Sequence, residues 1–370
     1  MMESATPGVA RDEAVDECGA AEGLPETDGF EFVEYTAPDP AQLTSLFRKM
    51  GFSAVARHRS KNVTLYRQGD INFILNAEPG SFAQAFGNLH GPSVCAMAFR
   101  VRDAAAAYRR LVAEGVHPFG PETGPMELNI PAVKGIGASV IYLVDRYGPR
   151  TIYDVDFVSL EGAEAGSAAG PAVGLTYIDH LTHNVHRGRM DEWAEFYERH
   201  FGFHEIRFFD IEGRSTGLRS RAMASPCGKI RIPINESSDD KSQIEEYLAA
   251  YNGEGIQHIA LGTDDIYATV EALRARGIAF MDVPDTYYDK IDERLPDHGE
   301  DMEKLRANRI LIDGEPGKDG RRLLQIFTTT VIGPIFLEII QRRSDEGFGE
   351  GNFQALFESI EADQIRRGVV

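Results

Sequence analysis

Three side chains of the type that binds metal ions stand in apolar, strand-like stretches in the second half of the chain. They are His180, His258 and Glu338. An ionised carboxylate in an apolar run such as Pro334–Gln341 is costly unless it is paired or bound to a metal. Two histidines and one carboxylate from separate strands are the ligands typical of non-haem iron(II) oxygenases, which leave other metal positions open. The sequence therefore predicts a metal site made by these three residues.

Two more histidines, His183 and His186, lie near His180 and are alternative ligands. Residues three apart on a strand point to opposite faces, so His180 and His183 are not expected to bind one ion together. His180 and His186 share a face but lie about 20 Å apart at ~3.3 Å per residue. One histidine of this stretch is the expected ligand. Taken alone, any of these histidines could be a satisfied core residue, and only the combination favours a metal.

Uncharged polar side chains in apolar, strand-like runs are candidates for orienting a polar ligand. These are Ser220, Asn235, Gln257 and Gln325. They could equally satisfy nearby backbone groups. The pair Arg342–Arg343 is interpreted as part of a solvated face rather than as an anion site.

The bulk composition excludes several classes of protein. The chain has 370 residues, of which 42% are hydrophobic and 26% charged, and its net charge is −20. Such an acidic chain is not expected to bind nucleic acid or anionic membrane surfaces. We find no transmembrane run and no signal peptide, and three scattered cysteines make no disulfide framework. A reducing cytoplasm is the expected setting.

A pattern of an apolar run followed by an amphipathic helix ending in glycine occurs four times. The expected helices span about 40–50, 103–114, 190–201 and 265–276, and extended stretches follow at 63–75, 138–144, 203–211 and 321–328. Residues 101–116 also align with 263–278, at an offset of 162. The chain therefore consists of two related halves, each with two modules.

The expected domain organisation follows from these repeats. Residues 1–29 are predicted to be a disordered acidic tail, and 159–172, rich in Gly, Ala and Ser, a linker. The domains would span 30–158 and 173–370. A final amphipathic helix is expected near the C-terminus.

The two halves differ at the proposed ligands. By the offset of 162, His258 corresponds to Ala96. By strand context, His180 is placed opposite Tyr35, and Glu338 opposite Asp154. We therefore expect the metal site only in the second half.

The motifs around these ligands resemble the 4-hydroxyphenylpyruvate dioxygenase family. They are Asp179–Val185, Gly255–Leu261, Leu324–Thr328, Phe336–Arg342 and Gly347–Phe353. The resemblance covers about residues 30 to 365. It implies the vicinal oxygen chelate fold, an α+β architecture of two open β-barrel domains. Each domain would be made of paired βαβββ modules, with a C-terminal helix as a lid.

The resemblance also implies the cofactor, the substrates and a pocket. Fe(II) would be held by His180, His258 and Glu338, and the substrates would be 4-hydroxyphenylpyruvate and O2. The products would be homogentisate and CO2, a step of tyrosine and phenylalanine catabolism, in a homodimer or homotetramer. The implied pocket contains Ser220, Pro233, Asn235, Gln257, Gln325, Phe327, Phe336, Phe348, Asn352 and Phe353. Phe336, Phe348 and Phe353 could instead be core residues.

Three rival functions remain at this point. Hydroxymandelate synthase uses the same scaffold, metal and substrate, but its pocket departs at the positions of Asn235 and Phe336. An extradiol-type dioxygenase of the same superfamily would cleave catechols. A metal-free binding module of that superfamily would need no ligand triad.

Overall fold

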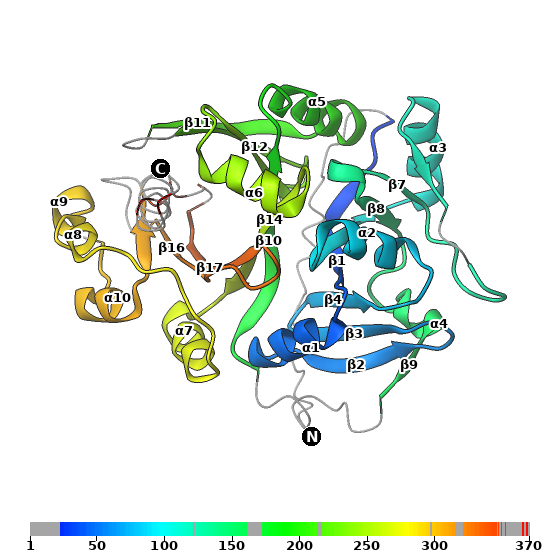
Figure 1. Cartoon of the computed structure of the whole chain (residues 1–370), viewed down its shortest axis with the longest axis horizontal. Coiled ribbons are helices and arrows are strands. Elements are labelled where there is room, and N and C mark those ends of the chain that lie inside the picture. The colour runs from blue at the N-terminus through cyan, green and yellow to red at the C-terminus, as the bar shows by residue number, and fades with distance from the viewer. Residues whose placement is uncertain are drawn as a thin grey trace, which may run out of the picture.

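The computed structural model describes residues 23–120, 123–160, 172–212, 217–296, 298–314 and 321–345, together with 347, 349, 352, 365 and 368. The two halves of the chain lie side by side, and each half contains one large sheet with helices outside it (Figure 1). Among the described residues, one sheet has nine strands and the other has eight. The expected fold, two open barrels of α+β type, is confirmed.

The first half contains two modules and a short closing segment. Its elements are β1 (Thr27–Thr36), α1 (Pro40–Lys49), β2 (Ser53–His58), β3 (Val63–Gln68), β4 (Ile71–Asn76), α2 (Phe82–His90), β5 (Ser93–Val101), α3 (Ala104–Ala113), β6 (Pro118–Phe119), β7 (Ala132–Lys134), the 3-10 turn η1 (Ile136–Ala138), β8 (Val140–Val144), α4 (Tyr153–Asp156) and β9 (Phe157–Ser159).

The second half repeats this order and adds three short helices before its last strands. Its elements are β10 (Leu175–Val185), α5 (Met190–Phe201), β11 (His204–Glu212), β12 (Gly217–Ala224), β13 (Arg231–Ser237), α6 (Gln243–Tyr251), β14 (Gly255–Thr263), α7 (Ile266–Ala275), α8 (Asp285–Tyr288), α9 (Ile291–Arg294), α10 (Met302–Asn308), β15 (Leu311–Asp313), β16 (Arg322–Phe327) and β17 (Phe336–Arg343).

Both sheets are built around the same three-strand pairing. In the first half, β1 runs antiparallel to β5, and β5 runs parallel to β8. In the second half, β10 runs antiparallel to β14, and β14 runs parallel to β17. The strand order is β6-β7-β8-β5-β1-β4-β3-β2-β9 in one sheet and β11-β12-β13-β10-β14-β17-β16-β15 in the other. The two halves therefore share one framework, and their positions can be compared residue by residue.

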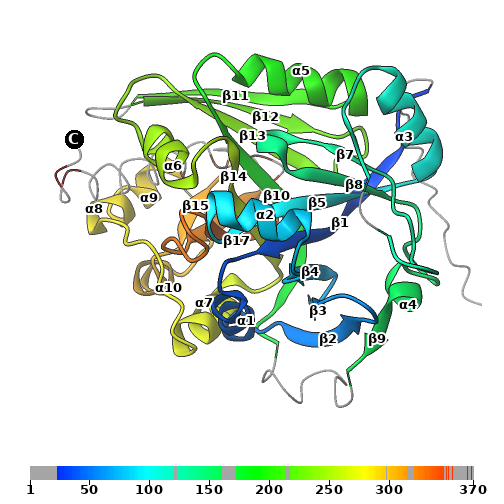
Figure 2. The same ribbon diagram turned by 45° about the vertical axis from the view of Figure 1, so that its right-hand side comes forward.

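The four helices expected from the repeated pattern are present as α1, α3, α5 and α7. Three of them begin with an aspartate whose carboxylate accepts a backbone N–H of the first turn: Asp39, Asp103 and Asp265. Helix α5 ends at Gly202, whose φ of 71° suits a glycine C-cap. This helix packs over β11, β12 and β13 (Figure 2). The helices α2, α4, α6, α8, α9 and α10 were not predicted.

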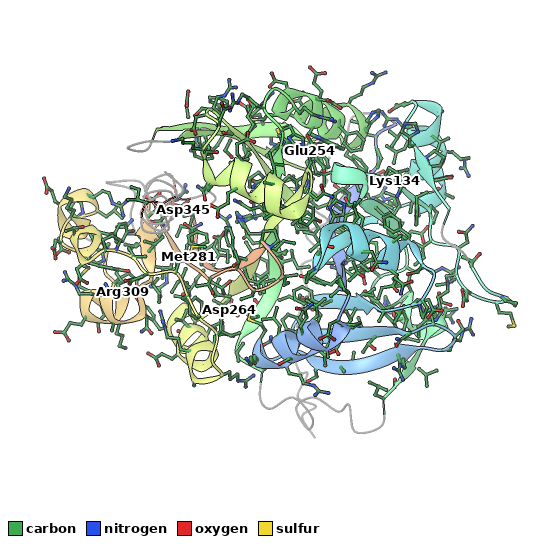
Figure 3. All side chains as sticks on the ribbon, in the orientation of Figure 1. Lys134, Glu254, Asp264, Met281, Arg309 and Asp345 are labelled. Atoms are coloured by element: carbon green, nitrogen blue, oxygen red, sulfur yellow. The ribbon has the colours of Figure 1, made fainter. Side chains whose placement is uncertain are left out.

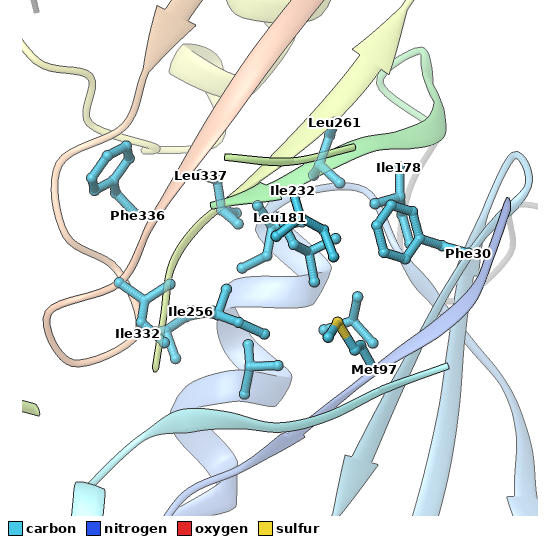
Figure 4. Close-up of a cluster of buried hydrophobic side chains, with 14 of the residues drawn as sticks. Phe30, Met97, Ile178, Leu181, Ile232, Ile256, Leu261, Ile332, Phe336 and Leu337 are labelled. Atoms are coloured by element: carbon cyan, nitrogen blue, oxygen red, sulfur yellow. The ribbon is translucent and has the colours of Figure 1, made fainter. Parts of the chain in front are cut away.

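The two halves share one hydrophobic core. Figure 4 shows Phe30 and Met97 of the first half close to Ile178 and Leu181 of the second. All four side chains are buried. Because burial of such side chains stabilises the folded chain by about 1.5–3 kcal/mol each, this contact holds the two sheets in a fixed relation.

The expected tail and C-terminal helix are only partly described. Strand β1 begins at Thr27, before the predicted boundary at residue 30, and residues 1–22 of the expected tail lie outside the described residues. Residue 159 belongs to β9, and 161–171 of the expected linker lie outside the described residues. The same holds for most of the expected C-terminal helix. No helix in the described part of the chain is long and apolar enough to span a membrane.

Candidate metal centre

The three predicted ligands come together on adjacent strands. His180 Nε2 lies 3.1 Å from Glu338 Oε2, His258 Nε2 lies 3.4 Å from the same oxygen, and the two Nε2 atoms are 3.3 Å apart. All three side chains are buried. Donors bound at ~2.1 Å to one ion at right angles would be about 3.0 Å apart. The three atoms therefore fit ligands on one face of a single metal ion.

Both imidazole rings are oriented so that Nε2 points toward Glu338. His180 Nδ1 contacts Asp179 Oδ1 at 2.8 Å, and His258 Nδ1 contacts Gln257 Oε1 at 3.0 Å. Because both partners accept hydrogen bonds, each Nδ1 carries the proton and each Nε2 presents a lone pair. Two lone pairs and a carboxylate oxygen converge on one point, and only a cation suits such a donor set. The residues present therefore fit a metal.

The charges of the three ligands depend on one another. Burial alone would raise the pKa of Glu338, but His180 and His258 outweigh it and lower that pKa to about 2. Burial also acts to lower the pKa of His180, but Glu338 and the hydrogen bond to Asp179 raise it overall. Burial lowers the pKa of His258. The two imidazoles therefore favour the ionised form of Glu338, which is the form that binds a cation.

Two β-bulges bring the partners of the histidines to their Nδ1 atoms. Ile178 pairs with Leu261 and His180 with Ala260, so Asp179 is an extra residue on β10. On β14, Gln257 is the extra residue between the partners of Thr182 and His183. A bulge interrupts the alternation of a strand and re-aims side chains. Neighbours that regular strands would point apart therefore contact each other.

A chain of hydrogen bonds leads away from the carboxylate ligand. Gln325 Nε2 donates to Glu338 Oε1 at 2.8 Å, and Asn352 Nδ2 donates to Gln325 Oε1 at 2.9 Å. The hydroxyl of Tyr287 in α8 lies 2.8 Å from Asn352 Oδ1. At Gly349, φ is +75°, and a Cβ would lie 2.4 Å from Gln325 Oε1. The chain end after β17 thus approaches the Glu338 side of the site, and glycine permits that approach.

Two polar side chains on the site face of the sheet have unused hydrogen-bonding atoms. Asn235 pairs with Ser220 on β12 and with Asn184 on β10. Asn184 lies two residues beyond Thr182, whose hydroxyl is 2.9 Å from His258 Nε2, so this row faces the metal side. Ser220 Oγ and Asn235 Oδ1 are buried and have no hydrogen-bond partner within the described parts of the chain. Both atoms are available to a polar group of a ligand.

Aromatic side chains surround the histidine ligand on β14. Phe336 pairs with His258, and their rings stack with centroids 4.7 Å apart and planes at 19°. Phe327 pairs with Glu338 and meets Phe336 edge-on at 6.0 Å. Pro233 is buried two residues before Asn235, on the same face of β13. These three residues give the site an apolar wall. Phe348 and Phe353 lie outside the described residues.

His183 is excluded from the metal site by its direction. Its Nε2 lies 2.8 Å from the hydroxyl of Tyr197 in α5, on the opposite face of the sheet. Burial lowers the pKa of His183 to about 3, so this ring is neutral. His186 is exposed. The expectation that one histidine of this stretch is the ligand agrees with this geometry.

The interpretation of Arg342 as a solvated side chain is wrong. Its side chain is 8% exposed, and its guanidinium donates to both oxygens of Asp179 at 2.7 and 2.9 Å. Burial alone would raise the pKa of Asp179, but Arg342 outweighs it and holds that pKa well below its usual range. The neighbouring Arg343 does behave as expected, since it is exposed and pairs with Glu300.

Two of the three predicted counterparts in the first half are also wrong. Ala260 pairs with both His180 and Glu338. The equivalent Ala98, 162 residues earlier, pairs with Phe32 and with Tyr142. The counterparts of the ligands are therefore Phe32, Ala96 and Tyr142, and only Ala96 was predicted. Strand context misplaced the others, since Tyr35 corresponds to His183, three residues further along β10, and Asp154 lies in α4, outside β8.

Sequence reasoning missed the partners Asp179, Thr182, Tyr287 and Arg342. The signal for Asp179 was present, since an aspartate directly before a histidine ligand in an apolar run is unusual. Regular alternation would have placed it on the opposite face. Tyr287 could not be found because it joins the site from a short helix far away in the sequence.

Comparisons with known proteins find relatives for both halves of the chain. Residues 23–158 match the family model described as hydroxyphenylpyruvate dioxygenase, N-terminal, and residues 177–292 match that of the glyoxalase/bleomycin resistance protein/dioxygenase superfamily. Over 347 residues the chain is 66% identical to Hemolysin VllY of Vibrio vulnificus. The match covers 93% of this chain and 97% of that protein.

Two further relatives bear on the chemistry. The chain is 62% identical to the 4-hydroxyphenylpyruvate dioxygenase of Pseudomonas aeruginosa over 93% of this chain and 96% of that one. A solved structure of a mutant 4-hydroxymandelate synthase from Streptomyces coelicolor matches with a TM-score of 0.79. Its sequence is 26% identical, and the match covers 92% of this chain and 100% of that one.

Proposed function

Since the chain belongs to the 4-hydroxyphenylpyruvate dioxygenase family, we propose that it converts 4-hydroxyphenylpyruvate and O2 to homogentisate and CO2. The cofactor in this proposal is Fe(II), bound by His180, His258 and Glu338. The observation that carries the proposal is the convergence of two Nε2 lone pairs and one carboxylate oxygen within a buried site. We also propose a cytoplasmic location and a homodimer or homotetramer, as the family resemblance implies.

Fe(II) held by three protein ligands would supply open positions for the 2-oxo acid and for O2, and would activate the oxygen. The chain's own residues keep those ligands in place. Asp179 and Gln257 fix the two imidazole rings, and Gln325 holds Glu338 Oε1 so that Oε2 faces the histidines. Gln257 and Gln325 would in this way orient the metal ligands as well as the substrate.

The substrate side of the site is formed by the row on β12 and β13. Ser220 Oγ and Asn235 Oδ1 would bind the phenol hydroxyl of the substrate, because each is buried and unpaired within the described chain. The ring would lie against Phe336, which already stacks on His258. The apolar wall of Phe327, Phe336 and Pro233 would exclude water while the ring reacts. Asn352 would hold Gln325 from the far side.

The nearest rival is benzylic hydroxylation of the same substrate, as in hydroxymandelate synthase. Two observations favour hydroxylation of the ring. Asn235 and Phe336, the positions at which the synthases depart, both lie on the site face of this chain. Identity is 62% with the dioxygenase but 26% with the synthase structure.

The test is anaerobic reconstitution with Fe(II), followed by 4-hydroxyphenylpyruvate and O2. Products are separated by chromatography, and the release of CO2 and the uptake of O2 are measured together. Homogentisate formed in equal amounts with CO2 is the expected result. Protein treated with a chelator is the control and should consume no oxygen.

Each other outcome overturns a different part of the proposal. Hydroxymandelate as the product would retain the iron site and reverse the position of hydroxylation. Protein that binds iron but consumes no oxygen would exclude this substrate, and catechols would be tested next. Protein that binds no metal would support the metal-free binding module.

A further inference from the structure

A buried ionic cluster lies directly behind one of the metal ligands. Its centre is Asp179, whose side chain is fully buried. One oxygen, Oδ1, contacts His180 Nδ1 at 2.8 Å and also accepts from Arg342 Nη2 at 2.9 Å. The other, Oδ2, accepts from Arg342 Nε at 2.7 Å and lies 3.7 Å from Arg231 Nη1.

The geometry of the cluster is suited to fixing the orientation of the His180 ring. A carboxylate that accepts from Nδ1–H fixes the tautomer and the plane of a histidine ligand, and makes its Nε2 a better donor. An isolated buried carboxylate would be unstable, and a bidentate guanidinium satisfies both of its oxygens. Arg342 follows Glu338 by four residues on β17, so one strand carries a metal ligand and the support of another ligand.

Arg342 also fixes the turn that follows β17. Its Nη1 donates to the carbonyl oxygens of Asp345 and Gly347. Asp345 lies on the side of the molecule away from the first half (Figure 3). The orientation of His180 is therefore tied to the chain segment after β17 through one guanidinium.

We propose that Asp179, held by Arg342, is a positioning residue that presets His180 for the metal and thereby sets the metal affinity of the site. The inference rests on the proposed metal-dependent function. It adds two residues that act through His180 and do not touch the substrate. Loss of either should weaken metal binding before any substrate is added.

The first half of the chain contains a natural control. Glu31 lies between Phe30 and Phe32 at the same bulge position as Asp179, and it is also buried. It pairs with Arg100 at 2.6 Å. The residue beside it is Phe32, so this buried ion pair has no metal ligand to orient. If Asp179 were only a structural ion pair, both carboxylates would behave alike.

The experiment measures Co(II) binding to the metal-free, full-length protein, by the visible absorption of the bound ion and by competition with a chelator. Asp179→Asn should weaken Co(II) binding by roughly 10–100-fold and shift the absorption band, since the ligand field at His180 changes. Arg342→Met should weaken it less, and Arg342→Lys should restore part of the loss. Glu31→Gln and Arg343→Met should leave the affinity and the band unchanged.

The melting temperature of each metal-free variant separates folding from positioning. The proposal is wrong if Asp179→Asn and Arg342→Met lower this temperature but retain wild-type affinity and spectrum. It is equally wrong if Glu31→Gln weakens Co(II) binding as much as Asp179→Asn. If Asp179→Asn does not fold, Arg342→Met and Arg342→Lys decide alone. Absence of Co(II) and Fe(II) binding by the wild type would instead refute the proposed function.

Discussion

The two halves of this chain use one framework for opposite purposes. Where the second half has His180, His258 and Glu338, the first half has Phe32, Ala96 and Tyr142. The rings of Phe32 and Tyr142 lie 5.5 Å apart and belong to an apolar cluster. The same strand pairing thus supports a polar metal site in one half and a hydrophobic core in the other.

Two buried glutamates show what the difference does to charge. Glu34, in the first half, accepts a hydrogen bond from Asn76, and burial raises its pKa. Glu338, equally buried, has its pKa lowered to about 2 because two imidazoles face it. Burial alone favours the neutral acid, and at Glu338 the charge and the hydrogen bonds of the two histidines reverse this effect. The charge state of a buried glutamate therefore depends on the side chains that face it, and the fold shared by the two halves brings those side chains together.

The largest expected effect comes from replacing His258 in the second half by alanine, the residue at the equivalent position 96 of the first half. His258→Ala removes one of the three ligands, as Ala96 does naturally. Metal affinity should fall by roughly 100-fold or more, a larger loss than for groups that only support a ligand. Turnover of 4-hydroxyphenylpyruvate should be lost with it. Metal content and product formation are measured together, and wild-type metal content in the variant would contradict the ligand assignment.

The reverse change tests whether the first half could hold the site. The triple variant Phe32→His, Ala96→His and Tyr142→Glu should lower the free energy of unfolding by about 3 kcal/mol or more. It breaks an aromatic contact and buries three polar groups without partners. Urea denaturation measures the loss, with Tyr142→Phe as the control that keeps the ring. Two bound metal ions per chain at unchanged stability would show that ligand identity alone suffices.

A third change probes the support of the carboxylate ligand. Gln325→Leu removes the hydrogen bond to Glu338 Oε1, and bonds to charged groups contribute about 1.5–3 kcal/mol. We expect kcat/KM to fall by roughly 10–100-fold, and the melting temperature to fall as well, because Glu338 Oε1 loses this donor. Gln341→Leu on β17 is the matched control, because Gln341 accepts from the backbone of Ile266 instead. Equal losses in both variants would show that packing, and not the support of Glu338, is responsible.

The smallest effect is the contribution of His183, on the far face of the sheet, to the free energy of unfolding at acidic pH. The pKa of His183 is lowered to about 3 by burial, whereas unfolded histidine titrates near pH 6.5. The unfolded chain therefore binds more protons below pH 6.5, and stability falls as pH falls. The contribution of His183 is about 1.4 kcal/mol per pH unit between roughly 6.5 and 3.

This contribution can be isolated by comparison with the first half. The equivalent residue there is Tyr35, whose pKa is raised by burial and which does not titrate in acid. In His183→Phe the fall of unfolding free energy between pH 6.5 and 5.5 should be smaller than in the wild type by about 1 kcal/mol, because unfolded histidine is only partly protonated in this range. Urea denaturation of metal-free protein measures it, and Tyr35→Phe should keep the wild-type slope. Parallel slopes in wild type and His183→Phe would refute the assignment.

The sequence alone determined the elements with strong local patterns. The helices α1, α3, α5 and α7 have an amphipathic face and a capping residue, and those signals act within a few residues. It also determined the triad, because charged and polar side chains in apolar strands are rare enough to stand out. The relation of the two halves followed from one alignment offset.

Only the tertiary structure decided what surrounds the ligands. Strand alternation places Asp179 and His180 on opposite faces, and a β-bulge, which has no local sequence signature here, brings them together. Phe32 and Tyr142 became visible as the counterparts only through the strand pairing, in which both lie beside Ala98. The sequence predicted a surface charge at Arg342. In the structure β17 pairs with β14, and this pairing brings the Arg342 guanidinium to Asp179. Periodicity fixes which residues are buried, but contacts between distant strands depend on a register that the assembled sheet sets.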